Sequence, residues 1–182
     1  NVNTERQIIK DLIKLSDPDL NIPTIFIWPE GVLASSNLDD IKKYKELFNE
    51  NFAEKHLIVL GINDILKNKN KLETYNSLIV ADNNLNIQNF YHKNNLVPFG
   101  EFLPLENYLT KLGLRSVTHG YQSFSAGETR EVINLKNKYF DLSFLPLICY
   151  EIIYSGKLSN NSNFDFIINI SEDGWFGDSI GP

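Results

Sequence analysis

The stretch LSFLPLICYEIIYSG, Leu142 to Gly156, begins with an apolar run that ends at the only cysteine of the chain, Cys149. A continuous run of aliphatic and aromatic residues predicts a strand that is buried on both faces. A cysteine in such a place is more often a small buried hydrophobic residue than a nucleophile. An acid, Glu151, follows two residues later, so the neighbouring residues must decide what the thiol does.

Helical and strand patterns alternate in the first part of the chain, and strand pairs dominate its middle. Apolar residues recur at helical spacing in residues 4–15 and 39–55, which predicts two amphipathic helices. Strand patterns occupy residues 24–30, 56–64, a hairpin at 74–93, a strand pair at 130–151 and a last strand at 164–171. The combination predicts a mixed α/β domain with a largely buried sheet.

Composition limits the class of protein. With 182 residues, 42% of them hydrophobic, the chain can form one domain with a sizeable core. A net charge of −6 and 17 scattered basic residues argue against nucleic acid as a partner. One cysteine excludes an internal disulfide and leaves the thiol free for chemistry. No apolar run approaches the roughly 18 residues of a membrane-spanning helix.

Metal and cofactor motifs are missing from the sequence. His56, His92 and His119 lie far apart and lack the spacing of metal ligands, so no metal site is predicted. The sequence contains no G-x-G-x-x-G, Walker A or G-x-S-x-G motif, so no motif supports a nucleotide cofactor or a serine hydrolase.

Three reactive side chains stand where predicted strands leave the core: Glu30, Lys93 and Cys149. Strand ends and the loops beyond them line the sites of α/β proteins, so we expect these side chains to converge. A thiol with a pKa of about 8.5 is only slightly ionised at neutral pH, and Glu30 could act as the base that it needs. The Lys93 ammonium could stabilise the oxyanion that forms when the thiolate attacks a carbonyl.

Each of these residues also has a purely structural interpretation. Glu30 could cap a helix, Lys93 could be a solvated loop charge and Cys149 could fill the core. An acid, an amine and a thiol together favour chemistry. Glu101 and Glu151 stand beside the same candidates, and an acid next to apolar side chains requires a partner such as Lys93.

Four segments carry a resemblance to a known family. They read FIWPEGVLAS from Phe26, YHKNNLVPFGEFLPLE from Tyr91, LICYEIIY from Leu147 and NISEDGWFGDSIGP from Asn169. They resemble motifs of the nitrilase superfamily of carbon–nitrogen hydrolases and, within it, of the bacterial apolipoprotein N-acyltransferases. The resemblance implies a nitrilase-like α-β-β-α sandwich. Since that family has membrane helices before this domain and more sandwich after it, residues 1–182 are expected to be a partial catalytic domain, truncated at both ends.

The resemblance also implies roles for individual residues. Glu30 matches the general base, Lys93 the oxyanion-stabilising lysine and Cys149 the nucleophile that takes the acyl group as a thioester. Supporting roles are implied for Glu101, Tyr150 and Glu151, and substrate contacts for Trp28, Phe99, Trp175 and Phe176. The implied reaction moves a fatty acyl group from a phospholipid to the N-terminal amine of an apolipoprotein, without a cofactor.

The implied location is the bacterial inner membrane, with the catalytic domain on the periplasmic side and attached through the membrane helices. The chain departs from the family pattern at Asn95, where histidine is usual, and at residues 172–174, where Glu-Asp-Gly replaces the more common Asn-Asp-Ala. Two alternatives remain open. One is a soluble amidase of the same superfamily, in which water takes the acyl group, and the other is a non-catalytic scaffold fragment.

Overall fold

The computed structural model describes residues 2–33, 37–38, 40–68, 71–105, 123–153 and 163–172. Their helices and strands are α1 (Val2–Ser16), β1 (Thr24–Ile27), η1 (Ile41–Tyr44), α2 (Lys45–Asn51), β2 (His56–Asn68), β3 (Lys71–Asp82), β4 (Ile87–His92), β5 (Ile133–Lys136), β6 (Asp141–Ile148), η3 (Cys149–Ile153) and β7 (Phe166–Ile170), of which η1 and η3 are 3₁₀ helices.

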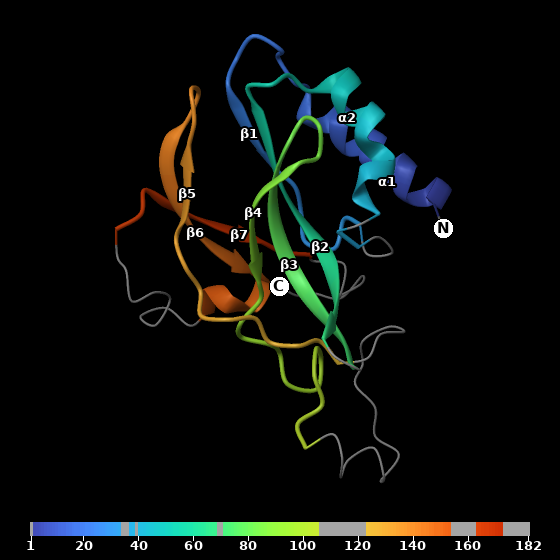
Figure 1. Ribbon diagram of the computed structural model, residues 1–182, viewed down its shortest axis with the longest axis vertical. Coiled ribbons are helices and arrows are strands. Elements are labelled where there is room, and N and C mark those ends of the chain that lie inside the picture. The colour runs from blue at the N-terminus through green and yellow to red at the C-terminus, as the bar shows by residue number, and fades with distance from the viewer. Residues whose placement is uncertain are drawn as a thin grey trace, which may run out of the picture.

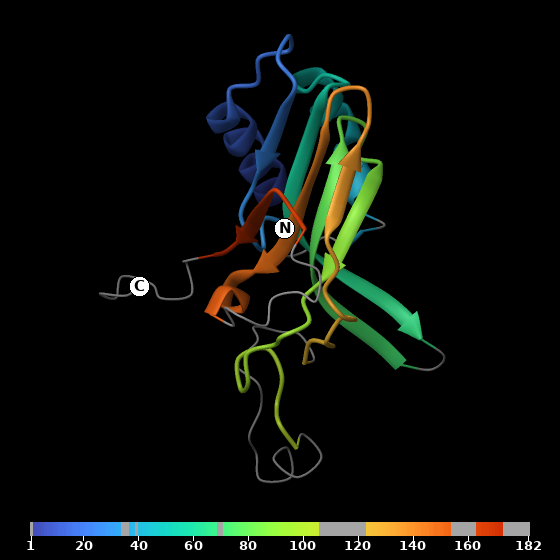
Figure 2. The same ribbon diagram turned by 90° about the vertical axis from the view of Figure 1, so that its left-hand side faces the viewer.

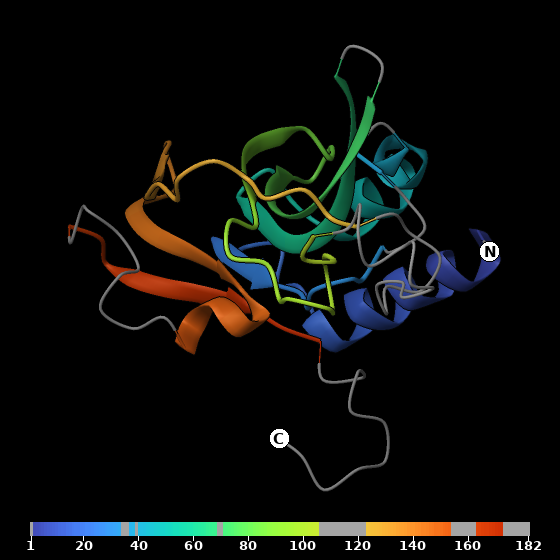
Figure 3. The same cartoon turned by 90° about the horizontal axis from the view of Figure 1, so that it is seen from below.

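The strands form two sheets, with the orders β1-β2-β3-β4 and β5-β6-β7. Strand β1 runs parallel to β2, and β6 runs parallel to β7 with Ile148 opposite Ile170, whereas the other neighbours are antiparallel. Helices α1 and α2 cover one face of the first sheet, and the second sheet lies on its other face (Figures 1 and 3). The described residues thus supply three layers of the expected sandwich, and the mixed α/β prediction is confirmed.

The two faces of β2 divide the core into two clusters. Ile58, Leu60 and Ile62 belong to the cluster beneath the helices, and Leu57 and Val59 belong to the cluster between the sheets. Successive side chains of a strand point to opposite faces, so a strand between two layers needs apolar residues at every position. This is why the run from His56 onward predicts a strand.

One predicted helix and two predicted strands have different lengths in the structure. The helix expected at residues 39–55 is a 3₁₀ turn followed by a short α2, which ends where Phe52 adopts extended backbone angles. Strands β2 and β3 pair continuously from Leu57 opposite Asp82 to Asn68 opposite Lys71, well beyond the predicted ends. Their far ends project from the body of the fold (Figure 2). Cross-strand pairing rather than burial forms this part, so its sequence lacks an apolar pattern.

A glycine in β2 allows the segment after β1 to lie against the sheet. A Cβ at Gly61 would lie 2.6 Å from the Glu30 Cα and 2.9 Å from the Gly31 nitrogen. The Gly61 N–H donates to the Pro29 carbonyl at 3.2 Å. The absence of a side chain at Gly61 therefore sets how closely Glu30 approaches the first sheet.

We expect Gly61→Ala to destabilise the protein by about 1–3 kcal/mol, because the added methyl group must displace backbone atoms rather than a flexible side chain. Denaturant unfolding of the purified protein would measure the loss. Gly100→Ala is the matched control, since the nearest atom to its Cβ would be the side-chain Cγ1 of Val97, at 3.3 Å. Equal stability of the two variants would contradict the close packing at Glu30.

Candidate active site

The three candidate catalytic residues follow strands of both sheets. Glu30 lies three residues beyond β1, Lys93 directly after β4, and Cys149 directly after β6, where η3 begins. Strands β1 and β4 belong to the first sheet and β6 to the second. The candidate site is therefore assembled from chain segments that only the stacking of the two sheets brings together.

Buried hydrogen bonds connect Glu30 to Lys93. Asn76 Nδ2, from β3, donates to Glu30 Oε1 at 2.7 Å and to Glu101 Oε1 at 3.1 Å. The Lys93 ammonium donates to the same Glu101 oxygen at 2.9 Å. All four residues are at most 9% exposed. Because a buried ammonium is costly without a counter-charge, Glu101 provides the partner that Lys93 requires.

Cys149 lies at a sharp backbone turn with a φ of +53°, a region that few residues other than glycine adopt. Its side chain is half-buried. Burial raises the pKa of the Cys149 thiol and the Glu30 carboxylate raises it further, whereas the Lys93 ammonium and the Tyr150 backbone lower it. Both charged side chains therefore lie within electrostatic reach of the thiol.

The Glu30 carboxyl has one oxygen engaged and one available. Oε1 accepts the hydrogen bond of Asn76, whereas Oε2 is buried and has no hydrogen-bond partner among the residues that the structure describes. Burial raises the pKa of Glu30, and the Lys93 charge and the Asn76 hydrogen bond oppose that rise. A carboxylate with a raised pKa and an available oxygen is suited to accept a proton.

Glu151 is fully buried and forms an ion pair with Arg130. Arg130 Nη2 donates to Glu151 Oε1 at 2.6 Å, and the Tyr91 hydroxyl donates to the same oxygen at 2.7 Å. Burial, followed by the Glu151 charge, raises the pKa of Tyr91, which keeps its hydroxyl protonated as a donor. The acid near Cys149 was expected to have a partner such as Lys93, but the partner is Arg130.

The Glu151 carboxylate also receives backbone hydrogen bonds from two strand ends. Oε1 accepts from the N–H groups of residues 94 and 95, at 3.2 and 3.0 Å, and Oε2 accepts from the Ile148 N–H at 3.0 Å. The first two groups directly follow Lys93, and the third directly precedes Cys149. One carboxylate therefore ties the backbone beside Lys93 to the backbone beside Cys149.

Three residues of this arrangement were absent from the sequence prediction. Asn76 had a signal, because it is a polar residue close to the apolar centre of a predicted strand. Tyr91 and Arg130 had none, since an aromatic strand residue and an arginine near a strand start are common. Only their burial and their hydrogen bonds to Glu151 distinguish them.

Trp28, which the resemblance placed among the substrate contacts, lies in the core between the first sheet and the helices. It is 3% exposed, its Nε1 donates to Ser16 Oγ at 3.0 Å, and its ring lies 5.4 Å from that of Phe48. This position gives no support to a substrate contact.

Of the other aromatic side chains expected at the site, those that the structure describes are partly exposed. Phe99 is 56% exposed and so presents surface to solvent. Tyr150, for which a supporting role was expected, lies beside Cys149 and is 40% exposed. Trp175 and Phe176 lie outside the described residues.

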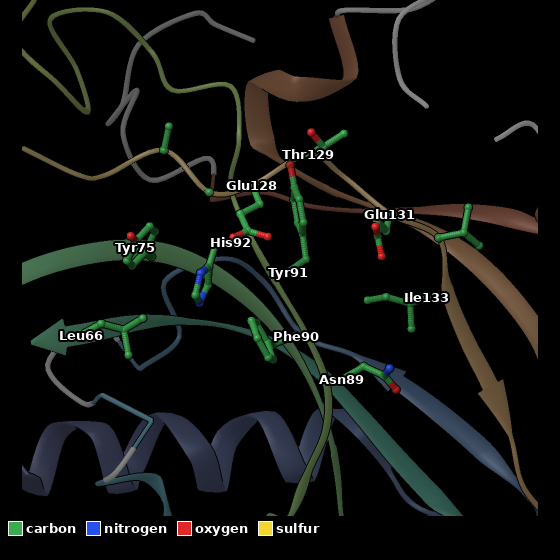
Figure 4. A pocket seen from close by; sticks show the side chains of 13 residues that line it. Leu66, Tyr75, Asn89, Phe90, Tyr91, His92, Glu128, Thr129, Glu131 and Ile133 are labelled. Carbon is green, nitrogen blue, oxygen red and sulfur yellow. The ribbon is translucent and has the colours of Figure 1, made fainter. Parts of the chain in front are cut away.

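An open cavity of about 930 Å³ lies between β4 and residues 126–133 (Figure 4). On its wall, Tyr75 stacks on His92 with ring centroids 4.4 Å apart, and His92 Nε2 lies 3.0 Å from Asp64 Oδ2. None of the three candidate catalytic residues lines it. The cavity is therefore separate from the candidate active site.

In the described ranges, no three His, Cys, Asp or Glu side chains lie close enough together to hold a metal ion. The same ranges contain no helix with the length and apolar character needed to cross a membrane.

Comparison with known proteins defines the class to which this fold and site belong. Residues 32–182 match the family model of carbon–nitrogen hydrolase, and the chain belongs to that family. An amidase from Nesterenkonia sp. shares the fold with a TM-score of 0.55 and 11% identity, over 98% of this chain and 64% of that one. A CN-hydrolase superfamily protein from Xanthomonas campestris does so with a TM-score of 0.53 and 14% identity, over 93% and 58%.

Curated relatives narrow the similarity to apolipoprotein N-acyltransferases. The chain is 33% identical to that of Wigglesworthia glossinidia brevipalpis, over 99% of this chain and 36% of the relative. It is 38% identical to that of Rickettsia prowazekii, over 93% and 33%. The chain thus spans about a third of the length of these relatives. The resemblance expected from the sequence motifs is confirmed.

The opposed effects of Glu30 and Lys93 on the thiol predict opposite reactivity changes. Glu30→Gln removes a charge that raises the pKa of Cys149, so alkylation by iodoacetamide at pH 8 should become roughly two- to tenfold faster. Lys93→Met should raise that pKa further and slow alkylation. Mass spectrometry at intervals between about pH 6 and 10 would give both profiles. Glu50→Gln, an exposed acid on α2, is the control, and rate changes of the same sign in both site variants would contradict the arrangement.

Arg130→Gln should destabilise the protein by about 3–5 kcal/mol, because it leaves the Glu151 carboxylate buried without a counter-charge. Adding Glu151→Gln should restore part of the loss, since two amides can share a hydrogen bond without a buried charge. Denaturant unfolding of the single and double variants measures both effects. A single variant as stable as the wild type would show that the ion pair does not hold this region together.

Proposed function

We propose that the complete protein transfers a fatty acyl group from a phospholipid, through a thioester on Cys149, to the N-terminal amine of the diacylglyceryl-cysteine of an apolipoprotein. One observation carries the proposal: a buried network connects Glu30 with Lys93, and both charges act on the same half-buried thiol. The names of the relatives support the choice of acyl transfer to an amine.

In the first half-reaction, the Cys149 proton moves to Glu30, and the thiolate attacks the ester carbonyl carbon of the phospholipid. A carbon–sulfur bond forms, and the carbonyl oxygen becomes an oxyanion near the Lys93 ammonium. Preorganised donors of this kind contribute roughly 10²–10³-fold each to the rate. The ester carbon–oxygen bond then breaks, and the leaving alkoxide takes the proton from Glu30. The products are a lysophospholipid and an acyl thioester.

In the second half-reaction, the neutral amine of the acceptor attacks the thioester carbon. Glu30 takes a proton from the attacking nitrogen, the carbon–sulfur bond breaks, and the Cys149 thiolate takes that proton. The product is an amide. One carboxyl group with an available oxygen serves both halves, and a general base contributes roughly 10²–10⁴-fold.

Glu101 and Glu151 have supporting roles in this proposal. Glu101 pairs with the Lys93 ammonium and keeps it in place, and Glu151 holds the backbone on either side of the site. The proposed location is the bacterial inner membrane, with this domain on the periplasmic side, because the motifs resemble those of an enzyme that acts on membrane lipids there.

A soluble amidase remains the second candidate, because the fold is shared with an amidase and the chemistry up to the thioester is the same. The two candidates differ in the nucleophile that cleaves the thioester. Water does so in the amidase, and an amine does so in the acyltransferase, so the lifetime of the thioester without an amine acceptor distinguishes them.

The full-length protein, given phosphatidylethanolamine but no acceptor, should accumulate one fatty acyl group on Cys149. An acyltransferase of this kind completes its first half-reaction alone, and the thioester persists if water is kept away. Intact-mass analysis would detect the group, and hydroxylamine should remove it. Cys149→Ala should never acquire it, and Glu30→Gln should acquire it roughly 10²–10⁴-fold more slowly.

Prompt release of free fatty acid would instead support the amidase, and an acyl group on Lys93 would refute the mechanism. A thiol no more reactive toward acyl donors than free cysteine would support a non-catalytic scaffold. Lys93→Arg is the informative conservative variant, because a planar guanidinium differs in shape and hydration from a compact ammonium. Near-normal acylation in that variant would show that Lys93 supplies only general positive potential.

A further inference from the structure

Glu172, one of the residues at which the chain departs from the family pattern, lies against the turn that carries the proposed base. A Cβ at Gly31, whose φ is +69°, would lie 2.7 Å from Glu172 Oε2. Burial raises the pKa of the neighbouring Glu30, and the Glu172 backbone is among the groups that lower it. Side chain and backbone of Glu172 thus both approach the Glu30–Gly31 turn.

Strand pairing explains this position. Strands β6 and β7 are parallel, with Ile148 opposite Ile170, so the residues that follow them leave the second sheet at the same end. Cys149 is the first residue after β6, and Glu172 is the second after β7. Glu172 is exposed, whereas Glu30 is buried, so Glu172 lies on the solvent side of the proposed base.

The charges near the base are unbalanced. Glu101 and Lys93 neutralise one another as a buried pair at 2.9 Å. Glu30 then remains, with a buried Oε2 that has no hydrogen-bond partner among the described residues. No ion pair of the described residues includes Glu172. An exposed carboxylate that forms no ion pair with the described residues, next to a second acidic side chain, favours a positively charged ligand.

We propose that Glu172 forms a subsite for the ammonium group of the acyl acceptor and so favours amines over uncharged nucleophiles. The inference rests on the proposed function, in which the acceptor is an N-terminal amine that is largely protonated at neutral pH. The resembling enzymes more commonly have asparagine at this position, so the charged contact belongs to this chain.

Glu172 and Glu30 have different roles in this proposal, as the transfer of protons shows. The acceptor binds beside Glu172 as an ammonium and loses one proton to solvent before it can attack. The neutral amine then forms the carbon–nitrogen bond, its second proton passes through Glu30 to the Cys149 thiolate, and the carbon–sulfur bond breaks. Glu172 forms no covalent bond, and its charge affects acceptor binding rather than the bond-breaking step.

The test separates the two half-reactions in the full-length protein. Wild type and Glu172→Gln are first acylated by phosphatidylethanolamine and then given a synthetic peptide with an N-terminal diacylglyceryl-cysteine. Acylation of Cys149 should proceed equally, whereas the KM for the peptide should rise roughly five- to tenfold in the variant, the loss expected for one charge-assisted contact. The change in kcat should stay below about twofold, since binding and not bond breaking is affected.

Two further measurements distinguish a binding role of Glu172 from a merely structural role. Added salt should raise the peptide KM of the wild type and leave that of Glu172→Gln nearly unchanged, because salt screens exposed charges. Hydroxylamine, an uncharged nucleophile, should cleave the thioester of both proteins at the same rate. Glu172→Asp should recover part of the affinity, and Glu50→Gln on α2 is the matched control for removal of an exposed acid.

Three outcomes would overturn the inference. An unchanged peptide KM in Glu172→Gln, with normal acylation, would refute it and leave the proposed function intact. Slower acylation of that variant from phosphatidylethanolamine, but not from phosphatidylglycerol, would assign the ammonium to the donor headgroup instead. Failure of even the wild type to acquire an acyl group would refute the proposed function, and the inference with it.

Discussion

The buried carboxylate of Glu151 connects the end of a strand in the first sheet to the end of a strand in the second. It accepts hydrogen bonds from the Arg130 guanidinium and the Tyr91 hydroxyl, and from backbone N–H groups beside Lys93 and Cys149. A carboxylate with this many donors is well solvated by the protein, so its burial costs little as long as every donor is present. The separation between the ammonium and the thiol therefore depends on a group that reacts with neither.

The candidate catalytic residues lie in a buried region where few side chains are charged. Glu101 balances Lys93, and Asn76 connects Glu101 to Glu30. Burial raises the pKa values of both Glu30 and Cys149, which favours the protonated form of each group. Fixed dipoles and charges in such a region act strongly because they do not reorganise during the reaction.

Two parallel strand pairs and one glycine shape the surroundings of the site. The β6–β7 pair brings the segments of Cys149 and Glu172 to one end of the second sheet, and β1 leads to Glu30 alongside β2. Gly61 lets the Glu30 backbone lie directly on β2. Segments from both sheets therefore lie close together, with the buried Glu30 and the exposed Glu172 near one another.

The sequence by itself determined the element types and the family, and it predicted the three candidate catalytic positions. Apolar runs and alternation are local patterns that arise from burial, and the motif words around Glu30, Lys93 and Cys149 are contiguous in the chain. Only the tertiary structure decided which partners these residues have. The pairing of Arg130 with Glu151, the bridge through Asn76 and the approach of Glu172 to Gly31 join residues distant in sequence. Such contacts depend on how two sheets stack, and local residue patterns do not encode that geometry.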